Sequence, residues 1–268
     1  MNILQEIAER TKARVEAQKK IVPLEKIMET VGAHCAQPQT NEVRPCKFEK
    51  ALKSNDIALI CEIKKASPSK GVIAEDFPYL DIARDYEAAG AAAISVLTEP
   101  YYFRGDDRYL REIADTVSIP LLRKDFTIDR YMIYEAKLLG ASAVLLICSI
   151  LGQEELAEYI GIAHSLGLSA LVEVHTEAEA GMALSAGARI IGVNNRDLKT
   201  FKVDITLSER LRKLVPPDVI FVSESGISSP DDIKRLREIG ADAALIGESI
   251  MRSGDKKAEI SRLRGIKD

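Results

Sequence analysis

One pattern recurs along this chain and limits its possible folds: an amphipathic helix, a glycine, and then an apolar strand. It occurs in the segments YEAAGAAAISVL, AKLLGASAVLLI, AHSLGLSALVEV, ALSAGARIIGV and LREIGADAALIG. Each glycine stands where the end of a helix needs a residue in the left-handed conformation before the chain turns into a strand. These glycines are Gly90, Gly140, Gly167, Gly187 and Gly240. Helices that alternate with strands in this way predict a parallel sheet.

Eight strands are predicted, and a helix is predicted after each. The strands are centred on residues 57–63, 92–97, 120–125, 143–147, 169–174, 190–193, 219–223 and 243–246. The helices are expected at about 79–89, 106–116, 129–139, 153–166, 176–186, 207–214, 230–239 and 255–265. Eight such units in about 210 residues match an α/β fold of the (β/α)8 TIM barrel type. A doubly wound open sheet is the alternative, but the chain has neither GxGxxG nor GxxxxGK.

Residues 1–50 lie outside this repeating pattern. Residues 2–32 predict two helices broken near Pro23, and residues 34–50 read as an irregular connection. The segment is too short and too polar to hold a core of its own. We therefore expect residues 1–268 to form a single barrel domain, with residues 1–50 as an N-terminal extension packed on it.

The composition excludes several classes of protein. A net charge of −4 and a pI near 5.6 argue against a nucleic-acid partner, which would need a basic face. The N-terminus has no signal-peptide stretch, and no segment approaches the ~20 apolar residues of a membrane span. We expect a cytoplasmic protein with no membrane partner.

Cysteine and histidine spacing predicts neither disulfides nor a metal site. The cysteines show no CxxC pair, and reduced thiols are expected, with a Cys35–Cys46 disulfide as the alternative. His34, His164 and His175 are too scattered to predict a metal centre. No metal and no cofactor are expected.

The stretch CEIKKASPSKG places opposite charges at the end of the first strand. Glu62 and Lys64 point to the same face of an extended chain, and burying such charges costs several kcal/mol per ion unless they are paired. Either this strand runs out into solvent or the two charges stand at the rim of a site. Catalytic residues of such barrels project from the carboxyl ends of the strands, which favours the second reading.

Other strands also end in polar residues, whereas the strand beginnings carry nothing comparable. Three different strands point Lys64, Lys124 and Glu173 inward, which favours a site over chance solvation; a structural ion-pair network is the alternative. We leave Glu224 and Glu248 open between exposed carboxylates and site residues, and we expect His175 to be a bystander rather than a base. The strand-end residues are Glu62, Lys64, Lys124, Glu173, Asn194, Arg196, Glu224, Ser225, Gly226, Gly247 and Glu248.

Small residues follow the first, seventh and eighth strands, in SPSKG, SGI and IGES. Their backbone N–H groups can approach an anion, and the loops after the last two strands commonly bind phosphate in such barrels. A small phosphorylated molecule is therefore the expected substrate.

The segments EIKKASPSKG, VLTEPYYFRG, LRKDF, VEVH, GVNNRDL, SESGI and LIGESIM occur in this order. Together they resemble the indole-3-glycerol phosphate synthase family of tryptophan biosynthesis. The resemblance covers nearly the whole chain, including the helical extension, which this family places over the barrel mouth. It implies a lyase that needs no cofactor and acts on 1-(2-carboxyphenylamino)-1-deoxyribulose 5-phosphate. Ring closure on the ribulose carbonyl, with loss of carbon dioxide and water, would give the indole.

The resemblance also implies a role for each site residue. Lys124 would be the acid for ring closure, its pKa lowered by burial and by the nearby Lys64. Glu173 would transfer a proton during dehydration, and either lysine could be the acid of that step. The remaining polar roles would fall to Glu62 and Asn194 at the ribulose, to Ser225 at the sugar, and to Arg196, which would meet the anthranilate carboxylate or brace Glu62.

The binding residues implied by the resemblance fall into two groups. Phosphate would be bound by Ser67, Gly226, Gly247 and the backbone of Glu248, whose side chain we expect to turn away. The benzene ring would lie among Phe103, Phe126, Leu145 and Phe201.

Two other functions compete with this interpretation. Phosphoribosylanthranilate isomerase would want a Cys/Asp acid–base pair, but Cys61 points to the wrong face. A non-catalytic barrel that binds a phosphorylated metabolite has no need of Lys64, Lys124 and Glu173 together. We expect a monomer.

Overall fold

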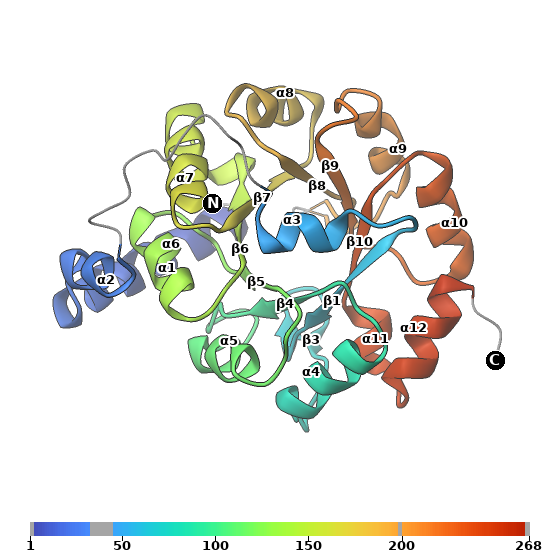
Figure 1. The fold of residues 1–268 in the computed structure, drawn as a ribbon, viewed down its shortest axis with the longest axis horizontal. Helices are drawn as coiled ribbons and strands as arrows, with labels where there is room; N and C mark the ends of the chain where they lie inside the picture. The colour runs from blue at the N-terminus through green and yellow to red at the C-terminus, as the bar shows by residue number, and fades with distance from the viewer. Residues whose placement is uncertain (1–2, 33–44, 198–199, 266–268) are drawn as a thin grey trace.

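Eight parallel strands form a closed barrel at the centre of the computed structural model, which describes residues 3–32, 45–197 and 200–265. The strand order around the barrel is β1-β10-β9-β8-β7-β6-β5-β4. Helices surround this ring on its outside (Figure 1). The predicted (β/α)8 barrel is confirmed.

The strands end within one residue of the predicted positions. They are β1 (Ala58–Ile63), β4 (Ala93–Leu97), β5 (Leu121–Lys124), β6 (Ala143–Ile147), β7 (Ser169–Val174), β8 (Ile190–Asn194), β9 (Ile220–Glu224) and β10 (Ala243–Ile246). The helices that follow them agree to within two residues. They are α4 (Tyr79–Ala88), α5 (Asp107–Ala114), α6 (Arg130–Leu138), α7 (Gln153–Ser165), α8 (Glu177–Ser185), α9 (Thr206–Arg212), α10 (Pro230–Glu238) and α12 (Lys256–Arg264).

The predicted glycine joints are also confirmed, because all five glycines have a φ in the left-handed region. The angles are +78° at Gly90, +87° at Gly140, +70° at Gly167, +86° at Gly187 and +73° at Gly240. A side chain at these positions would be strained, so the glycines let each helix end directly before its strand.

Strand β1 shows how the alternation of side chains builds the core. Ala58 and Ile60 face the barrel interior, whereas Leu59 and Cys61 face the surrounding helices. Residues two apart share a face, so Glu62 continues the inward-facing row at the carboxyl end of the strand. Cys61 thus faces away from the interior, as predicted.

The N-terminal extension begins with α1 (Ile3–Ile21) and α2 (Leu24–Thr30), and the predicted break at Pro23 is confirmed. Leu4 and Ile7 of α1 are buried, and they line one cavity together with Lys124, Asn194 and Glu224, the last residues of β5, β8 and β9. The first half of α1 therefore lies over the carboxyl end of the barrel.

The expected irregular connection through residue 50 is wrong at its end, because Lys47–Leu52 form helix α3. Phe48 and Leu52 are fully buried, and Glu49 of α3 accepts a hydrogen bond from the hydroxyl of Ser169, the first residue of β7, at 3.4 Å. Helix α3 therefore covers the amino-terminal end of the barrel, and in Figure 1 it lies across the centre of the ring. Cys35 and His34 lie outside the described residues, whereas Cys46, Cys61 and Cys148 are free thiols.

Several short elements follow strand ends and were not predicted. They are the hairpin of β2 (Ala66–Ser67) and β3 (Gly71–Val72), the 3-10 helix η2 (Cys148–Ile150) and helix α11 (Glu248–Arg252). Each comes after the carboxyl end of a strand and so adds to the rim of the barrel mouth. No helix in the described ranges has both the length and the hydropathy needed to cross a membrane.

Candidate active site

A cavity of about 450 Å³ opens at the carboxyl ends of the barrel strands. All fifteen site residues predicted from the sequence lie on its wall, although they come from all eight barrel strands and the segments that follow them. They are Glu62, Lys64, Ser67, Phe103, Lys124, Phe126, Leu145, Glu173, Asn194, Arg196, Phe201, Ser225, Gly226, Gly247 and Glu248. The geometry brings these residues together, and the role of each stays a prediction.

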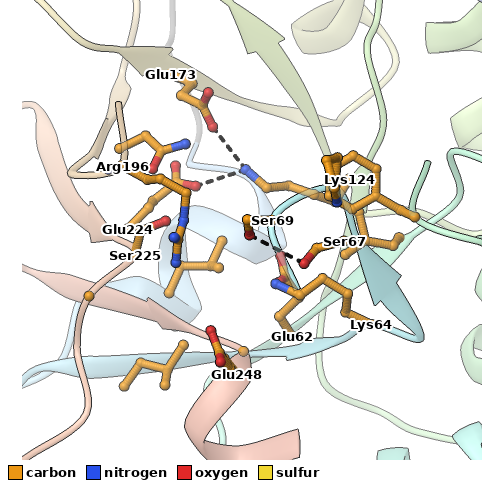
Figure 2. Close-up of a pocket in the computed structure, with 18 of the residues that line it drawn as sticks. Glu62, Lys64, Ser67, Ser69, Lys124, Glu173, Arg196, Glu224, Ser225 and Glu248 are labelled. Carbon is orange, nitrogen blue, oxygen red and sulfur yellow. Dashed lines mark hydrogen bonds and ion pairs between the residues drawn. The ribbon is translucent and has the colours of Figure 1, made fainter. Parts of the chain in front are cut away.

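An ion cluster occupies one wall of this cavity (Figure 2). The Nζ atom of Lys124 lies 3.0 Å from Oε2 of Glu173 and 2.8 Å from Oε2 of Glu224. The three side chains come from β5, β7 and β9, and all are largely buried. Charges in such a place interact far more strongly than on the surface.

Glu224 belongs to this ion cluster, although the sequence left open whether it is an exposed carboxylate or a site residue. It is only 2% exposed, and its Oε1 atom has no hydrogen-bond partner in the described part of the chain. Burial and the nearby Glu173 and Glu62 raise the pKa of Glu224 to about 7, despite the attraction of Lys124. The inward direction of Glu224 could have been predicted from the sequence, because side chains two residues apart in a strand share a face. This alternation places Glu224 on the inward face with Ile220 and Val222.

A glycine on the neighbouring strand makes room for this carboxylate. A Cβ atom at Gly192 would lie 2.2 Å from Oε1 of Glu224. Gly192 pairs in register with Val222 of β9, two residues before Glu224. The missing side chain of Gly192 therefore lets Glu224 turn inward toward Lys124.

The expected lowering of the pKa of Lys124 is wrong. Burial lowers the pKa of this lysine, but attraction to Glu173, Glu224 and Glu62 outweighs burial and raises it above the ordinary value. The expected cationic neighbour does not act this way, because Lys64 pairs with Glu62 instead. Lys124 is thus an ammonium at neutral pH.

The pair of Glu62 and Lys64 forms a second charged group at the end of β1. The position of this ion pair explains why residue 247, in the loop after β10, is a glycine. A Cβ atom at Gly247 would lie 2.6 Å from Oε1 of Glu62 and 3.2 Å from Nζ of Lys64. The loop after β10 can approach this ion pair so closely only because residue 247 has no side chain.

Two aromatic rings and two aliphatic side chains of the extension form an apolar part of the cavity wall. The ring centroids of Phe103 and Phe126 are 6.1 Å apart, and Leu4 and Ile7 of α1 lie on the same cavity. The cavity is thus charged on one side and apolar on another. Such a surface suits a ligand with an aromatic ring at one end and anionic groups at the other.

Glu99 positions Phe103, and the sequence analysis missed this residue. Its side chain is fully buried and accepts hydrogen bonds from three backbone N–H groups, at 3.0 Å from Tyr101, 2.7 Å from Tyr102 and 3.0 Å from Phe103. A buried carboxylate needs such donors. The only signal was an acidic residue between a strand and the aromatic run of TEPYYF.

Strained backbone also gathers at the mouth. In the described residues, three side-chain-bearing positions have a positive φ: Arg104 at +52°, Phe201 at +58° and Ser225 at +66°. Phe201 and Ser225 line the cavity, and Arg104 directly follows Phe103, which does so too. Such conformations cost about 1–3 kcal/mol each and are concentrated at functional sites.

Arg196 takes a different partner from one that the sequence suggested. Its guanidinium donates to the carbonyl oxygen of Phe201 at 3.2 Å, and its backbone N–H donates to Oδ1 of Asn194 at 3.1 Å. Within the described part of the chain it forms no ion pair with Glu62. Arg196 therefore braces the loop after β8 and leaves Glu62 to Lys64.

The rim near α11 carries a second small ion network. The Oε1 atom of Glu248 lies 3.3 Å from Nζ of Lys70 and 3.3 Å from Nε of Arg252. These contacts join the hairpin of β2 and β3 to the start of α11. The carboxylate of Glu248 is therefore neutralised by two cations beside the glycine loops.

Comparison with known proteins identifies the family. The model of the family described as indole-3-glycerol phosphate synthase matches residues 4–263. The chain belongs to the indole-3-glycerol phosphate synthase family. An indole-3-glycerol phosphate synthase of Ruminiclostridium cellulolyticum is 60% identical over 263 residues, which are 98% of this chain and 99% of the relative. One of Endomicrobium trichonymphae is 51% identical and covers 99% of this chain and 100% of its own length.

Among solved structures, 3-hexulose-6-phosphate synthase from Salmonella typhimurium is similar to this member of the indole-3-glycerol phosphate synthase family. The TM-score is 0.64 at 16% identity, with 78% of this chain and 98% of that chain covered. A thiamine phosphate pyrophosphorylase from Pyrococcus furiosus has a TM-score of 0.59 at 18% identity and covers 79% of this chain and 96% of its own. At such identities the likeness shows the barrel fold alone. In the ranges described, no group of three or more His, Cys, Asp or Glu side chains is placed to hold a metal ion.

Proposed function

We propose that this protein catalyses the reaction of its family, the formation of indole-3-glycerol phosphate in tryptophan biosynthesis. As a carbon–carbon lyase it would close the ring of 1-(2-carboxyphenylamino)-1-deoxyribulose 5-phosphate with release of one carbon dioxide and one water. The observation that carries the proposal is the buried cluster of Lys124, Glu173 and Glu224 beside the Glu62–Lys64 pair in one cavity.

Ring closure requires an acid at the carbonyl oxygen of the ribulose part. Lys124 can serve because its raised pKa keeps it protonated at neutral pH. The ammonium group would polarise the carbonyl and then give a proton to the developing alkoxide. General acid–base assistance of this kind contributes about 10²–10⁴-fold in rate.

Dehydration requires a base for one proton and an acid for the departing hydroxyl group. Glu173 suits the base, because attraction to Lys124 and His175 outweighs burial and holds its pKa below the ordinary value. Glu224, with a pKa of about 7, can both hold and release a proton near neutrality. A Lys124 or Lys64 ammonium would assist the departing hydroxyl group.

Substrate binding would use the two remaining sides of the cavity. The backbone N–H groups of Gly226, Gly247 and Glu248, with Ser67, would bind phosphate, because small residues allow close approach to an anion. The aromatic ring would lie against Phe103, where the wall is apolar.

We also propose that residues 1–268 act as a single domain and as a monomer in the cytoplasm. The burial of Leu4 and Ile7 at the cavity supports a covering role for the start of the extension. One chain supplies all the cavity residues named above, so a second copy is not needed to complete the site. Free thiols at Cys46, Cys61 and Cys148 suit a reducing compartment.

The test is a fluorescence assay for indole-3-glycerol phosphate with purified protein and no added metal or cofactor. We expect turnover, and we expect Lys124→Ala to lower it by roughly 100-fold or more, the scale of lost general-acid catalysis. Lys137→Ala, on the exposed part of α6, is the matched control and should keep wild-type turnover. Absence of product from the wild type would favour a barrel that only binds a phosphorylated metabolite, and near-normal turnover in Lys124→Ala would refute the role of Lys124.

A further inference from the structure

His175 contacts the oxygen atom of Glu173 that Lys124 does not use. Lys124 binds Oε2 of Glu173, whereas Nε2 of His175 lies 3.6 Å from Oε1. Glu173 and His175 are two positions apart at the end of β7, with Val174 between them, so their side chains lie on the same face of the chain. His175 therefore contacts the carboxylate of Glu173, which is a proposed proton-transfer group, at the oxygen atom opposite to the one that Lys124 binds.

A second carboxylate holds the imidazole ring from the other side. Oε2 of Glu179, on α8, accepts a hydrogen bond from the backbone N–H of His175 at 2.6 Å and lies 3.6 Å from ring atom Nδ1. The side chain of His175 is 15% exposed. The ring thus lies between two carboxylates that come from different elements.

Both ring nitrogens face acceptors, and this decides which protonation state fits. A neutral imidazole has one N–H donor and one acceptor, whereas an imidazolium has two donors. The neutral ring would turn a lone pair toward one of the two carboxylates. The buried Nε2 atom has no hydrogen-bond partner in the described residues, and a contact of 3.6 Å to Glu173 is just too long for one. A small shift of either side chain would let an imidazolium donate to Glu173 and Glu179 together.

We infer that His175, held by Glu179, is a positioning residue for Glu173, which it orients through Oε1 and keeps ionised by its positive charge. This inference rests on the proposed function, because it gives His175 a part in the proton transfer assigned to Glu173. When the ring loses its proton, one of the two cations beside Glu173 disappears, and Glu173 then holds a proton more strongly.

The ionisable groups around the ring favour its charged form. Glu179 of α8, Glu173 of β7 and Glu224 of β9 attract the imidazolium, and the thiol of Cys148 in η2 donates to the carbonyl oxygen of Glu179 at 3.8 Å. Burial lowers the pKa of His175, but the three carboxylates outweigh it and raise the pKa above 6.5. Burial raises the pKa of Cys148 to about 12, so this thiol stays neutral in the same pH range.

The first test measures the imidazole directly, with no need of catalysis. Histidines labelled with ¹⁵N are titrated by NMR in the wild type, Glu173→Gln and Glu179→Gln, and His175→Gln assigns the signal. We expect the pKa of His175 to fall by roughly one unit in each Glu variant, the usual effect of losing a carboxylate at this distance. His164 is the internal control, because burial and Arg189 lower its pKa to about 4. An unchanged pKa of His175 in both variants would overturn the inference.

The second test measures catalysis with the full-length enzyme. His175→Gln keeps an N–H donor but cannot titrate, and we expect kcat to fall about 10-fold, a share of the 10²–10⁴-fold of general acid–base catalysis. KM should change less than about 2-fold, and the inflection of His175 should vanish from the pH profile of kcat, whereas His164→Gln should keep the wild-type profile. If the wild type is active and His175→Gln has the same kcat and the same pH profile, the inference is refuted. A wild type that forms no product would refute the proposed function, and the NMR shifts would still decide the coupling of His175 to Glu173.

Discussion

The ion pair of Arg14 and Asp125 joins the N-terminal helix to the residue that follows Lys124. Nη2 of Arg14 lies 2.9 Å from each carboxylate oxygen of Asp125, across 111 positions of sequence. The Arg14 side chain is 12% exposed and that of Asp125 is 0% exposed. We predict that Arg14→Met loosens α1 and destabilises the whole fold.

The loss of stability expected for Arg14→Met depends on the interactions that Asp125 keeps when Arg14 is replaced. Removing one partner of a buried ion pair costs about 3–5 kcal/mol because the other charge stays buried. Asp125 retains hydrogen bonds from the hydroxyl of Thr98 at 2.7 Å and the N–H of Phe126 at 2.8 Å, and Arg123 lies 3.7 Å away. We therefore expect a loss of about 2–3 kcal/mol in the free energy of unfolding. With an unfolding entropy of about 2.1 cal/mol/K per residue, this loss lowers Tm by about 4–5 °C.

A double-mutant cycle measures the interaction itself. Urea unfolding of Arg14→Met, Asp125→Asn and the double variant should give a coupling energy of about 2 kcal/mol. Arg10→Met is the control on the same helix, because Arg10 is 55% exposed and lies 3.7 Å from Glu6; it should cost less than about 1 kcal/mol. A coupling energy below about 0.5 kcal/mol would refute the argument.

The same variant should change the response to acid. Burial raises the pKa of Asp125, but Arg14 and Arg123 outweigh it and hold the pKa below 3.8. A lowered carboxylate pKa gives stability that is present above the unfolded value and is lost as pH falls through the folded value. Arg14→Met should therefore lose less stability than the wild type between pH 5 and the acid transition.

Two further predictions concern Glu224 and the extension. Because the folded pKa of Glu224 is raised from 4.5 to about 7, its contribution to stability is present below 4.5 and lost as pH rises through 7. Glu224→Gln should remove this decline from the free energy of unfolding measured in urea between pH 4.5 and 7.5, and exposed Glu238→Gln should not; identical slopes in wild type and Glu224→Gln would contradict the assignment. Deleting residues 1–45 removes α1 and α2 but keeps α3, and it should raise KM or abolish activity because Leu4 and Ile7 leave the cavity wall. Unchanged kcat and KM in the truncated protein would show that the extension is not part of the site.

Most of the fold was predictable because its signals are local. A glycine after each of five helices and a run of apolar residues after each glycine place the elements without any knowledge of tertiary contacts. Helix α3 was missed because six residues give too little periodicity, and the burial of Phe48 and Leu52 has meaning only once a barrel end exists to receive them.

The candidate site was partly predictable for a different reason. The rule that parallel strands direct their carboxyl ends to one mouth finds Lys64, Lys124 and Glu173 from sequence alone. It does not tell which carboxylate pairs with which ammonium, since this depends on the order of strands and on the space left by Gly192. For this reason the raised pKa of Lys124 could not be read from the chain.

The distribution of charges in the cavity explains how this site can exchange protons near neutral pH with a strongly basic lysine. Glu62 pairs with Lys64, and Glu173 lies between Lys124 and the imidazole of His175. Glu224 shares Lys124 with Glu173 and forms no further ion pair in the described part of the chain; its Oε1 atom is unpartnered there, and its pKa is about 7. An anionic substrate adds negative charge and therefore favours the protonated form of Glu224. A carboxylic acid beside Lys124 thus titrates near neutrality, and the lysine itself can remain an ammonium that polarises the carbonyl.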